Sequence, residues 1–386
     1  MASTDLRRNV KVFGTTSFFN DTASEMAYWV LPAFLVSIGA GPATLGIIEG
    51  IAESVSAAAK LWSGLLVDRI RQRKPVVVSG YVVANAVKPL LALCSAWWQV
   101  LGIRFADRLA KGVRGAPRDV MLAESVEKGN VGSAFGLLQA MDSAGAIVGP
   151  LLALLLINHV GVRGVFWAAA IPGVICIVAI SAFARETGKP LDVAKPAKLK
   201  SSGKLSPLFY YLMGAVTIFS IGNSSDMFLV LRAQNVGIGV AYAPLLGLVF
   251  NTTYTLFSWP AGKMSDTMSK KGLVAAGYMV FAIVYAVFAI APSKAAIWGA
   301  FAFYGLYYAL TQPVLRAMVA NAAPPESRGR AFGIFYFVTS VTALLASVIT
   351  GEVWKHFGAA LPFYVSAAAA FVAAVMVMAA PRPAES

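Results

Sequence analysis

The sequence predicts an all-α membrane protein with twelve transmembrane helices in two related halves. Three observations support this fold class: few charged residues, long apolar runs and a repeated charged turn. Of 386 residues, 58% are hydrophobic and 13% are charged, whereas a soluble protein carries about 25% charged residues. Runs of about 20 apolar residues are long enough to cross a bilayer as helices, while the strands of a membrane barrel would alternate in polarity.

Twelve apolar runs follow one another nearly end to end along the chain. We expect transmembrane helices over residues 13–38, 43–68, 75–95, 97–118, 132–157, 162–184, 207–231, 238–262, 271–291, 295–320, 329–352 and 358–380. A lysine-rich segment separates the sixth run from the seventh. It divides the chain into an N-terminal six-helix bundle (1–184), a cytoplasmic linker (185–206) and a C-terminal six-helix bundle (207–386).

The positive charges are unevenly distributed between the loops. Arg8, Lys11, the basic cluster at 69–74, the linker lysines and Lys271 all fall on one side of the predicted helices. Loops rich in Lys and Arg face the cytoplasm, so we expect cytoplasmic termini and a location in the bacterial inner membrane, surrounded by lipid. This topology accounts for the net charge of +14, and nucleic acid is not expected as a partner.

The sequence gives no sign of a cofactor or of enzymatic chemistry. Cys94 and Cys176 lie inside apolar runs and predict neither a disulfide framework nor a metal site. The chain contains no phosphate-binding loop, nucleophile motif or metal-hydrolase motif, so ATP-driven transport and catalysis are not predicted. We expect no cofactor, no metal and a monomeric protein.

A short charged turn occurs once in each half. In the first half it contains Gly64, Asp68 and Arg69, followed by further basic residues up to Pro75. In the second half it recurs in weaker form with Gly262 and Asp266. Repeats that follow in the same order across an even number of helices have the same orientation in the membrane.

The residues of this turn resemble the loop signature of the major facilitator superfamily, which joins the second and third helices of each half. The resemblance covers nearly all of the chain and implies two pseudo-symmetric six-helix bundles around a central cavity, with transport by alternating access. It also implies that Gly64, Asp68, Arg69 and Asp266 are gating residues on the inner side. Substrate is expected near the midplane between the halves.

The fourth apolar run carries four charged residues. Arg104, Asp107, Arg108 and Lys111 recur at steps of three and four, so they share one helical face. Each charge near the helix centre costs about 2.5–3.5 kcal/mol in lipid, which predicts that this face lines a cavity or forms internal pairs. Arg108 followed by Gly112 resembles the fourth-helix motif of the superfamily, whose arginine is linked to proton coupling in drug/proton antiporters. Lys111 departs from that motif and adds positive charge.

The fifth run resembles the antiporter motif of the same superfamily. Its Gly145, Gly149 and Pro150 are expected to shape the helix and its packing during gating, and they favour an exporter over an importer. Asp142 lies one turn before Gly145.

The first run carries two acids four residues apart, Asp21 and Glu25, with Asn20 beside them. Ionisable residues inside a membrane predict a functional site, and a carboxyl group removed from water can bind and release protons. We expect Asp21 and Glu25 to exchange protons under the influence of Arg108, with Asp142 as an alternative carrier. A structural ion pair with the arginines of the fourth run is compatible with this role.

Other intramembrane charges extend the predicted site. Glu49 and Glu53 are expected at the mouth of the cavity or in a salt bridge to the other half. Asp226 repeats Glu25 within a Ser-acid-Met motif, and Arg316 lies in the repeat of the fourth run. The side chains expected to bind substrate are Asn20, Arg104, Asp107, Lys111, Asp226 and Arg316.

These observations predict a proton-coupled secondary transporter that exports a small organic compound, with an anionic or zwitterionic substrate favoured by the positive wall. Three alternatives stay open. The protein could be a proton symporter that imports an organic anion, an exporter of a siderophore or metal complex, or a facilitator fold without transport activity that acts as a sensor or assembly partner. The same scaffold carries many cargoes, so the fold alone does not choose among them.

Overall fold

The structure is a computed structural model that describes residues 2–40, 42–70, 72–187, 205–239, 242–291 and 293–380. Most of the predicted lysine-rich linker, residues 188–204, lies outside the described residues. Within these ranges every regular element is a helix, which agrees with the predicted all-α class.

The helices of the first half follow the predicted runs, except that α1 begins 11 residues before the predicted start of the first run. They are α1 (Ala2–Ser37), α2 (Pro42–Val67), α3 (Lys74–Val87) with η1 (Lys88–Leu93), α4 (Trp97–Glu124), η2 (Lys128–Asn130), α5 (Val131–Ala168) and α6 (Ala170–Val178) with η3 (Ala179–Phe183). Gly161 has φ 67° and ψ 177° inside α5, so the chain turns there between the two runs predicted at 132–157 and 162–184. Glycine tolerates this positive φ without strain.

The helices of the second half also match, with one difference. They are α7 (Pro207–Gly222), α8 (Met227–Asn235), α9 (Ala243–Thr267), α10 (Lys270–Ile290), α11 (Lys294–Ala322), η5 (Pro325–Ser327), α12 (Arg328–Phe357) and α13 (Ala360–Ala379). The run predicted at 207–231 is interrupted at 223–226, between α7 and α8.

Polar groups at this interruption bind partners outside the helix. The Asn223 amide donates to the Tyr307 hydroxyl at 3.4 Å, and the Ser225 N–H donates to the Ser347 hydroxyl at 3.0 Å. Such bonds compete with the helical hydrogen-bond ladder. The apolar composition of the run predicted its position but not its break.

The chain forms two compact units. Unit 1 contains Met1–Glu127, Met141–Gly203 and Pro325–Ile334, and unit 2 contains Lys128–Ala140, Lys204–Pro324 and Phe335–Ser386. The first turns of α5 therefore group with unit 2, and the first turns of α12 group with unit 1. Each of these two helices has its remaining residues in the other unit.

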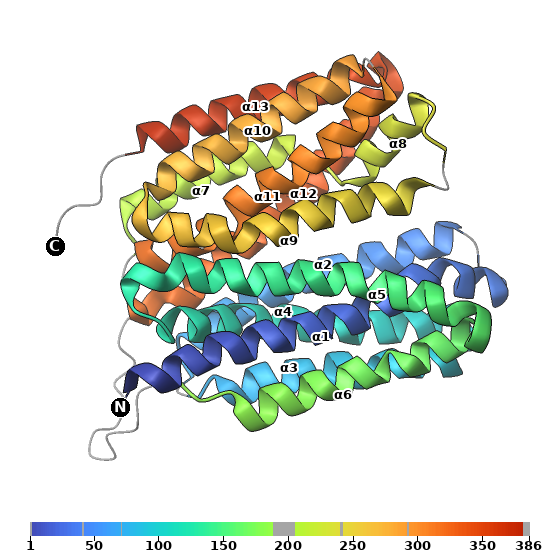
Figure 1. The fold of residues 1–386 in the computed structure, drawn as a ribbon, viewed down its shortest axis with the longest axis horizontal. Coiled ribbons are helices and arrows are strands. Elements are labelled where there is room, and N and C mark those ends of the chain that lie inside the picture. Colours follow the sequence, from blue (N-terminus) through green and yellow to red (C-terminus); the bar gives the residue numbers. More distant parts are fainter. Residues whose placement is uncertain are drawn as a thin grey trace. The chain divides into compact units, whose positions relative to one another are not determined.

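Helix pairs within the units correspond to one another, as the internal repeat predicts. In unit 1, α4 packs against α2 and α3, and α6 packs against α1 and α3. In unit 2, α11 packs against α9 and α10, and α13 packs against α7 and α10. Figure 1 shows α1, α3 and α6 running side by side in unit 1, and α7, α10 and α13 doing so in unit 2.

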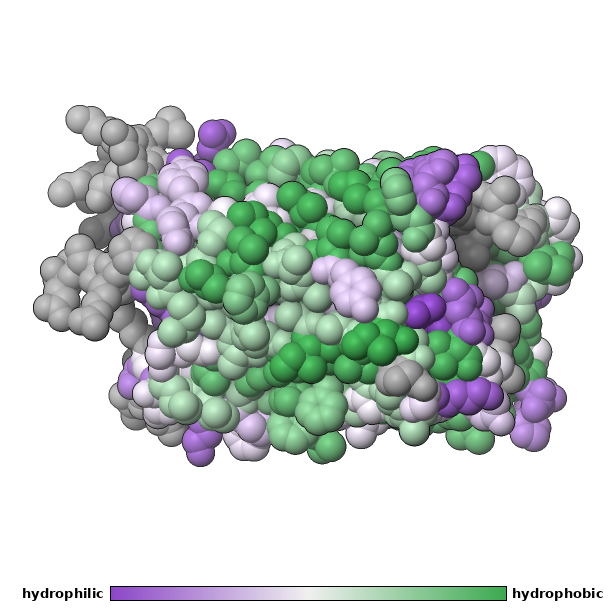
Figure 2. Space-filling view, turned by 90° about the horizontal axis from the view of Figure 1, so that it is seen from above, coloured by the Kyte–Doolittle hydropathy of each residue, from purple (hydrophilic) through white to green (hydrophobic). Residues whose placement is uncertain are grey.

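Apolar side chains cover much of the molecular surface. Figure 2 shows them across the middle of the face in view, with hydrophilic side chains gathered toward its two ends. By length and composition, five helical segments within the described ranges could cross a membrane: Lys74–Leu93, Val131–Phe183, Lys270–Ile290, Pro325–Phe357 and Ala360–Ala379. Among the helices that fall short of this apolar composition, α1, α2 and α4 carry the charged residues of the predicted site.

Candidate functional site

A network of charged side chains lies inside unit 1, with α4 as its centre. The Arg104 guanidinium, on α4, is buried and donates to both carboxylate oxygens of Glu49 on α2, at 2.7–2.9 Å. It also lies 3.5 Å from the Asp107 carboxylate. Two-pronged contacts of this kind are the strongest form of arginine–carboxylate pair.

Asp107 and Arg108, the next charged residues on this face of α4, also form ion pairs. Asp107 is buried 3.8 Å from the ammonium of Lys88, and Arg108 lies 3.2 Å from Glu53 on α2. Glu49 and Glu53 therefore pair with α4 of their own unit. This pairing differs from the salt bridge to the other half that was one of the two expectations, while their expected position at the mouth of the cavity stays a prediction. Glu49 and Glu53 are four residues apart on α2, as Arg104 and Arg108 are on α4, which suits the pairing.

Lys111 differs from these neighbours. Its side chain is exposed, and it makes no ion pair within 4.0 Å with any residue that the structure describes. It nevertheless lies within electrostatic range of Asp21, Glu25, Glu53 and Asp142. Lys111 is thus an accessible cation whose nearest acids are not in direct contact with it.

Asp21 on α1 and Asp142 on α5 form a carboxyl pair. Their side chains are close enough to interact electrostatically. The Ser17 hydroxyl donates to Asp142 at 2.6 Å, and the Asn20 amide donates to Asp21 at 2.8 Å. Two neighbouring ionised carboxylates repel each other, so a proton on one of them would stabilise the pair.

Close packing of α1 against α5 brings the two acids together. A Cβ atom on Gly145 would lie 2.5 Å from the Phe18 carbonyl oxygen, and one on Gly149 would lie 2.7 Å from the Thr22 carbonyl oxygen. Both obstacles are backbone atoms of α1, so only glycine allows this separation. Pro150 follows within the same helix.

Asn85 on α3 joins the carboxyl pair to the α4 network. Its amide donates to the Asn20 side-chain oxygen at 3.2 Å, and its own oxygen accepts from the Lys88 ammonium at 3.1 Å. The sequence analysis did not select Asn85. Its spacing of three residues from Lys88, inside an otherwise apolar run, is the signal that could have found it.

Unit 2 holds aromatic hydroxyls where unit 1 holds charges. The Tyr304 hydroxyl, on α11, donates to the Asp226 carboxylate at 2.7 Å. The Asp226 side chain is exposed, whereas Tyr285, Tyr304 and Tyr307 are fully buried. The tyrosines were not predicted as site residues, although Tyr304, Tyr307 and Thr311 recur on α11 at steps of three and four.

Two arginines of unit 2 occupy different surroundings. Arg232 donates to the carbonyl oxygens of Phe288 and Ala289, both at 2.9 Å, and so caps the end of α10. Arg316 is half-buried within α11, after Pro313.

The two charged turns bind the first turn of another helix. The Asp68 carboxylate accepts the N–H groups of Gly329 and Arg330 at the start of α12, both at 2.7 Å. Backbone N–H groups at a helix N-terminus favour an anion. Burial raises the pKa of Asp68 to about 6, although these N–H donors and the nearby guanidinium of Arg73 act in the opposite direction.

The equivalent turn in unit 2 has the same geometry. The Asp266 carboxylate accepts the N–H groups of Gly132 and Ser133 at 2.7 and 2.8 Å, at the start of α5. It also accepts the Ser133 hydroxyl at 2.5 Å. The two carboxylates therefore serve as matched acceptors for two helix N-termini.

The remaining residues of the first turn have separate positions. A Cβ atom on Gly64 would lie 2.5 Å from both the Gly329 carbonyl oxygen and the Gly333 Cα atom, so glycine is needed for this contact. Arg69 is exposed, whereas Arg73 forms an ion pair with Glu124 at the end of α4. Gating by these residues stays a prediction.

The sequence profile of the Major Facilitator Superfamily matches residues 13–232 and 211–386. The chain belongs to this superfamily. Its members are membrane transporters of small molecules rather than enzymes. The predicted family and fold class are confirmed.

Related proteins of the superfamily match over most of their length. An uncharacterised MFS-type transporter of Methanocaldococcus jannaschii is 34% identical over 361 residues, which cover 91% of this chain and 89% of that protein. The multi-drug resistance efflux pump PmrA of Streptococcus pneumoniae is 23% identical over 374 residues, 92% of each chain.

Solved structures share the fold at lower identity. The human organic anion transporter MFSD10 (TETRAN) has a TM-score of 0.82 and 15% identity, covering 96% of this chain and 99% of that one. The Escherichia coli fucose:proton symporter FucP has a TM-score of 0.79 and 11% identity, covering 97% and 98%. At these identities the likeness establishes the fold and leaves the substrate open.

Proposed function

We propose that this superfamily member is a proton-coupled antiporter that exports a small organic compound bearing an anionic group. The observation that carries the proposal is the neighbouring pair of acids, Asp21 and Asp142, with their donors Ser17 and Asn20. Both acids lie inside helices that we assign to the membrane, where an ionisable residue is costly and marks a functional site. Glu25, one turn after Asp21, is the third acid of this group.

The carboxyl pair is suited to bind and release one proton. With the proton present, one carboxyl donates to the other, and Ser17 and Asn20 satisfy further oxygens. Without it, two like charges face each other, and α1 and α5 are held too closely by Gly145 and Gly149 for the acids to separate freely. Proton loss therefore favours a different arrangement of α1 against α5, which couples protonation to conformation.

We propose that Lys111 binds the anionic group of the substrate. The other cations of the predicted face, Arg104 and Arg108, are engaged by Glu49 and Glu53, and in our proposal they hold the wall in place with Asp107. Lys111 is exposed and can bind a carboxylate, sulfonate or phosphate group. A bound anion would compete with Asp21 and Glu25 for the same positive charge, so its arrival would favour protonation of the acids. This linkage by itself favours symport, and the choice of antiport rests on the resemblance to the efflux pump PmrA.

The two charged turns are assigned to gating. In the proposed cycle, the bonds from Asp68 to α12 and from Asp266 to α5 form together and break together. The reason is that α5 and α12 each have their first turns in one unit and their remaining residues in the other. Gly64 permits the close contact on one side, and Arg69 and Arg73 extend the basic surface. The basic loops favour cytoplasmic termini, which puts this gate on the inner face.

The related proteins bear on the direction in which the substrate is transported. PmrA is named as an efflux pump, and this chain resembles it over nearly its whole length, which favours export. The exposed Lys111 also favours a second candidate, a symporter that imports an organic anion together with a proton. The two candidates predict opposite relations between substrate movement and proton movement.

A transport assay in everted membrane vesicles tests the proposal. Respiration acidifies the vesicle lumen, and a pH-sensitive dye reports the gradient while organic anions, zwitterions and cationic drugs are added singly. We expect an anionic or zwitterionic compound to release lumenal protons with the wild-type protein. The same compound should give no signal with Asp21→Asn or Asp142→Asn and a normal signal with the exposed control Glu127→Gln.

Two further measurements separate the candidates. Proton-driven accumulation of the compound inside everted vesicles supports export, whereas proton-driven uptake by intact cells supports import. Difference infrared spectroscopy of purified protein should show a protonated carboxyl band at neutral pH that Asp21→Asn and Asp142→Asn each remove. Absence of that band in the wild type would overturn the shared-proton pair even if transport were seen.

A further inference from the structure

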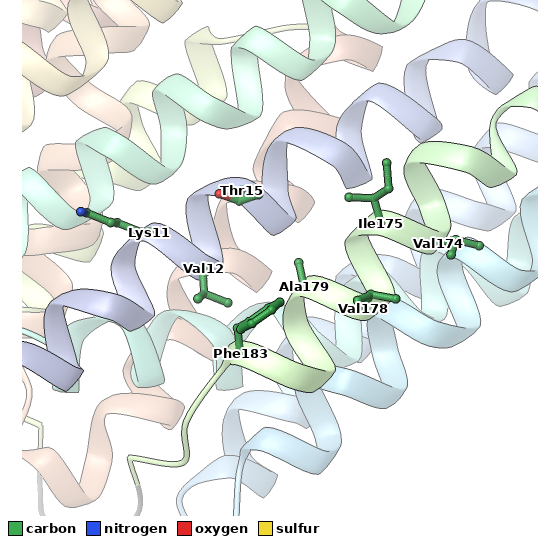
Figure 3. Close-up of a pocket in the computed structure, with 8 residues that line it drawn as sticks. All are labelled: Lys11, Val12, Thr15, Val174, Ile175, Val178, Ala179 and Phe183. Atoms are coloured by element: carbon green, nitrogen blue, oxygen red, sulfur yellow. The ribbon is translucent and has the colours of Figure 1, made fainter.

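A groove lies between α1 and α6 of unit 1, away from the charged network. It has a volume of about 430 Å³, within the range of about 300–1,000 Å³ of small-molecule pockets. Lys11, Val12 and Thr15 line it from α1, and the other lining residues are Val174, Ile175, Val178, Ala179 and Phe183. Figure 3 shows Lys11 at one end of the row and Val174 and Ile175 at the other.

The two ends of the groove differ in chemistry. Apart from Thr15, the side chains beyond Lys11 are all apolar, so most of its length suits a hydrocarbon chain. At the other end, Lys11 is exposed, and the Arg8 guanidinium lies 5.5 Å from the centroid of the Phe183 ring. No described acidic residue forms an ion pair with Lys11 within 4.0 Å.

The location of these residues points to a lipid rather than a soluble ligand. Lys11 lies two to three turns from the N-terminus of α1, and η3 ends at Phe183, so the basic end of the groove adjoins the ends of both helices. Basic residues at such positions extend toward the membrane surface. Basic pockets between transmembrane helices bind anionic lipid headgroups.

We propose that this groove binds one anionic phospholipid, with an acyl chain along Val12, Val178 and Phe183 and the phosphate group near Lys11 and Arg8. A neutral lipid would fill the apolar part equally well but would gain nothing from the two cations. The site therefore selects for headgroup charge. It is separate from the carboxyl pair, which lies further along α1.

Native mass spectrometry of the detergent-purified protein tests this site. Dioleoyl phosphatidylglycerol and dioleoyl phosphatidylcholine are titrated separately, and the occupancy of the first bound lipid is compared. Each basic residue near an anionic headgroup contributes about fivefold in affinity. We expect the wild type to prefer phosphatidylglycerol by about fivefold or more, and Lys11→Gln to lose most of that preference.

Matched variants separate charge from shape. Lys11→Arg should keep the preference, and Lys263→Gln, which removes an exposed lysine from α9 instead, should leave it unchanged. Ala179→Trp fills the groove and should weaken binding of both lipids. Glycerol 3-phosphate, which lacks acyl chains, should not displace phosphatidylglycerol at millimolar concentration.

Several outcomes would overturn the proposal. Equal affinity for the two lipids in the wild type would remove the role of the basic end. An unchanged preference in Lys11→Gln would do so as well, and because Lys11 is exposed this variant is expected to fold. Full displacement by glycerol 3-phosphate would show a phosphate site without an acyl-chain site.

Discussion

The fourth helix of each half, α4 in unit 1 and α11 in unit 2, has the same place in the fold but different chemistry. Aligned on Pro117 and Pro313, Arg108 corresponds to Tyr304 and Lys111 to Tyr307. In α4 these positions hold charges: Arg108 pairs with Glu53 of α2, whereas Lys111 forms no ion pair with a described residue. In α11 they hold tyrosines that pack against other rings, with ring centroids of Tyr304 and Tyr307 at 5.5 Å.

The difference shows how two repeated halves with the same helix packing can carry different functional residues. The helix packing is common to both units, so it does not require the charges. The charges of unit 1 are costly in a membrane, and most of them lie beside side chains of opposite charge. Unit 2 contributes Asp226, an exposed carboxylate that accepts a hydrogen bond from the buried Tyr304. We therefore expect proton coupling to depend on unit 1 and substrate selection to depend on both.

The largest effect is expected from the acids. Asp21→Asn and Asp142→Asn should each lower proton-coupled transport by about 100-fold or more, since a positioned proton carrier contributes at least that much. Asp226→Asn should leave proton coupling intact and raise the substrate concentration needed for half-maximal transport. Vesicle transport measured against pH and substrate concentration checks this, and loss of coupling in Asp226→Asn would break the comparison.

A second contrast concerns Arg104, which is buried, and Arg232, which is half-buried. Arg104→Gln should lower the free energy of unfolding by about 3 kcal/mol, because it leaves the half-buried Glu49 and the buried Asp107 charges poorly compensated. Arg232→Gln removes two hydrogen bonds to carbonyl oxygens and should cost about 1–2 kcal/mol. Reversible unfolding in mixed micelles gives both values. The double variant Arg104→Met/Glu49→Met should recover much of the loss, and equal losses in the single variants would contradict this picture.

Glycine substitutions test the packing that holds the carboxyl pair together. Gly145→Ala places a methyl group against the α1 backbone and should cost about 1–3 kcal/mol through overpacking. Gly102 on α4 has no atom within 4 Å of its Cβ position, so Gly102→Ala should be neutral or stabilise the helix by up to about 1 kcal/mol. Thermal unfolding measures both, and the protonated carboxyl band should weaken only in Gly145→Ala.

A smaller effect is expected in unit 2. Tyr304→Phe removes the hydroxyl that donates to Asp226 and should lower the free energy of unfolding by about 1 kcal/mol. The pH dependence of transport should not move, because the proton pair lies in the other unit. A shift of the pH profile in Tyr304→Phe as large as that in Asp142→Asn would show that Asp226 also carries protons.

The smallest effect concerns the Asp68 turn. Burial raises the pKa of Asp68 to about 6, while an unfolded aspartate has a pKa of about 3.9. The folded protein therefore binds a proton on Asp68 more tightly than the unfolded chain does. This proton binding stabilises the folded state fully below about pH 4, and the stabilisation is lost as the pH rises through about 6. The stability of the wild type relative to Asp68→Asn should thus fall between about pH 4 and pH 6. A pH-independent difference in melting temperature would contradict the assignment.

Much of the fold followed from the sequence because it depends on local composition. Long apolar runs can cross a bilayer only as helices, and most of the predicted runs appear as helices near their predicted bounds, although α1 begins 11 residues before its predicted start. The break at 223–226 did not follow, since Asn223 and Ser225 leave the helix for partners on α11 and α12. Spacing also predicted that Arg104, Asp107, Arg108 and Lys111 share a face.

The sequence by itself determined the superfamily, the repeat and the presence of charged side chains that must be compensated, because lipid penalises charge at any position. Only the tertiary structure decided which charges compensate one another. The pairs of Arg104 with Glu49 and of Asp21 with Asp142 join different helices, and the approach of those helices depends on contacts such as Gly145 against Phe18. Lys111 was left exposed by that same packing, which no spacing along one helix could show.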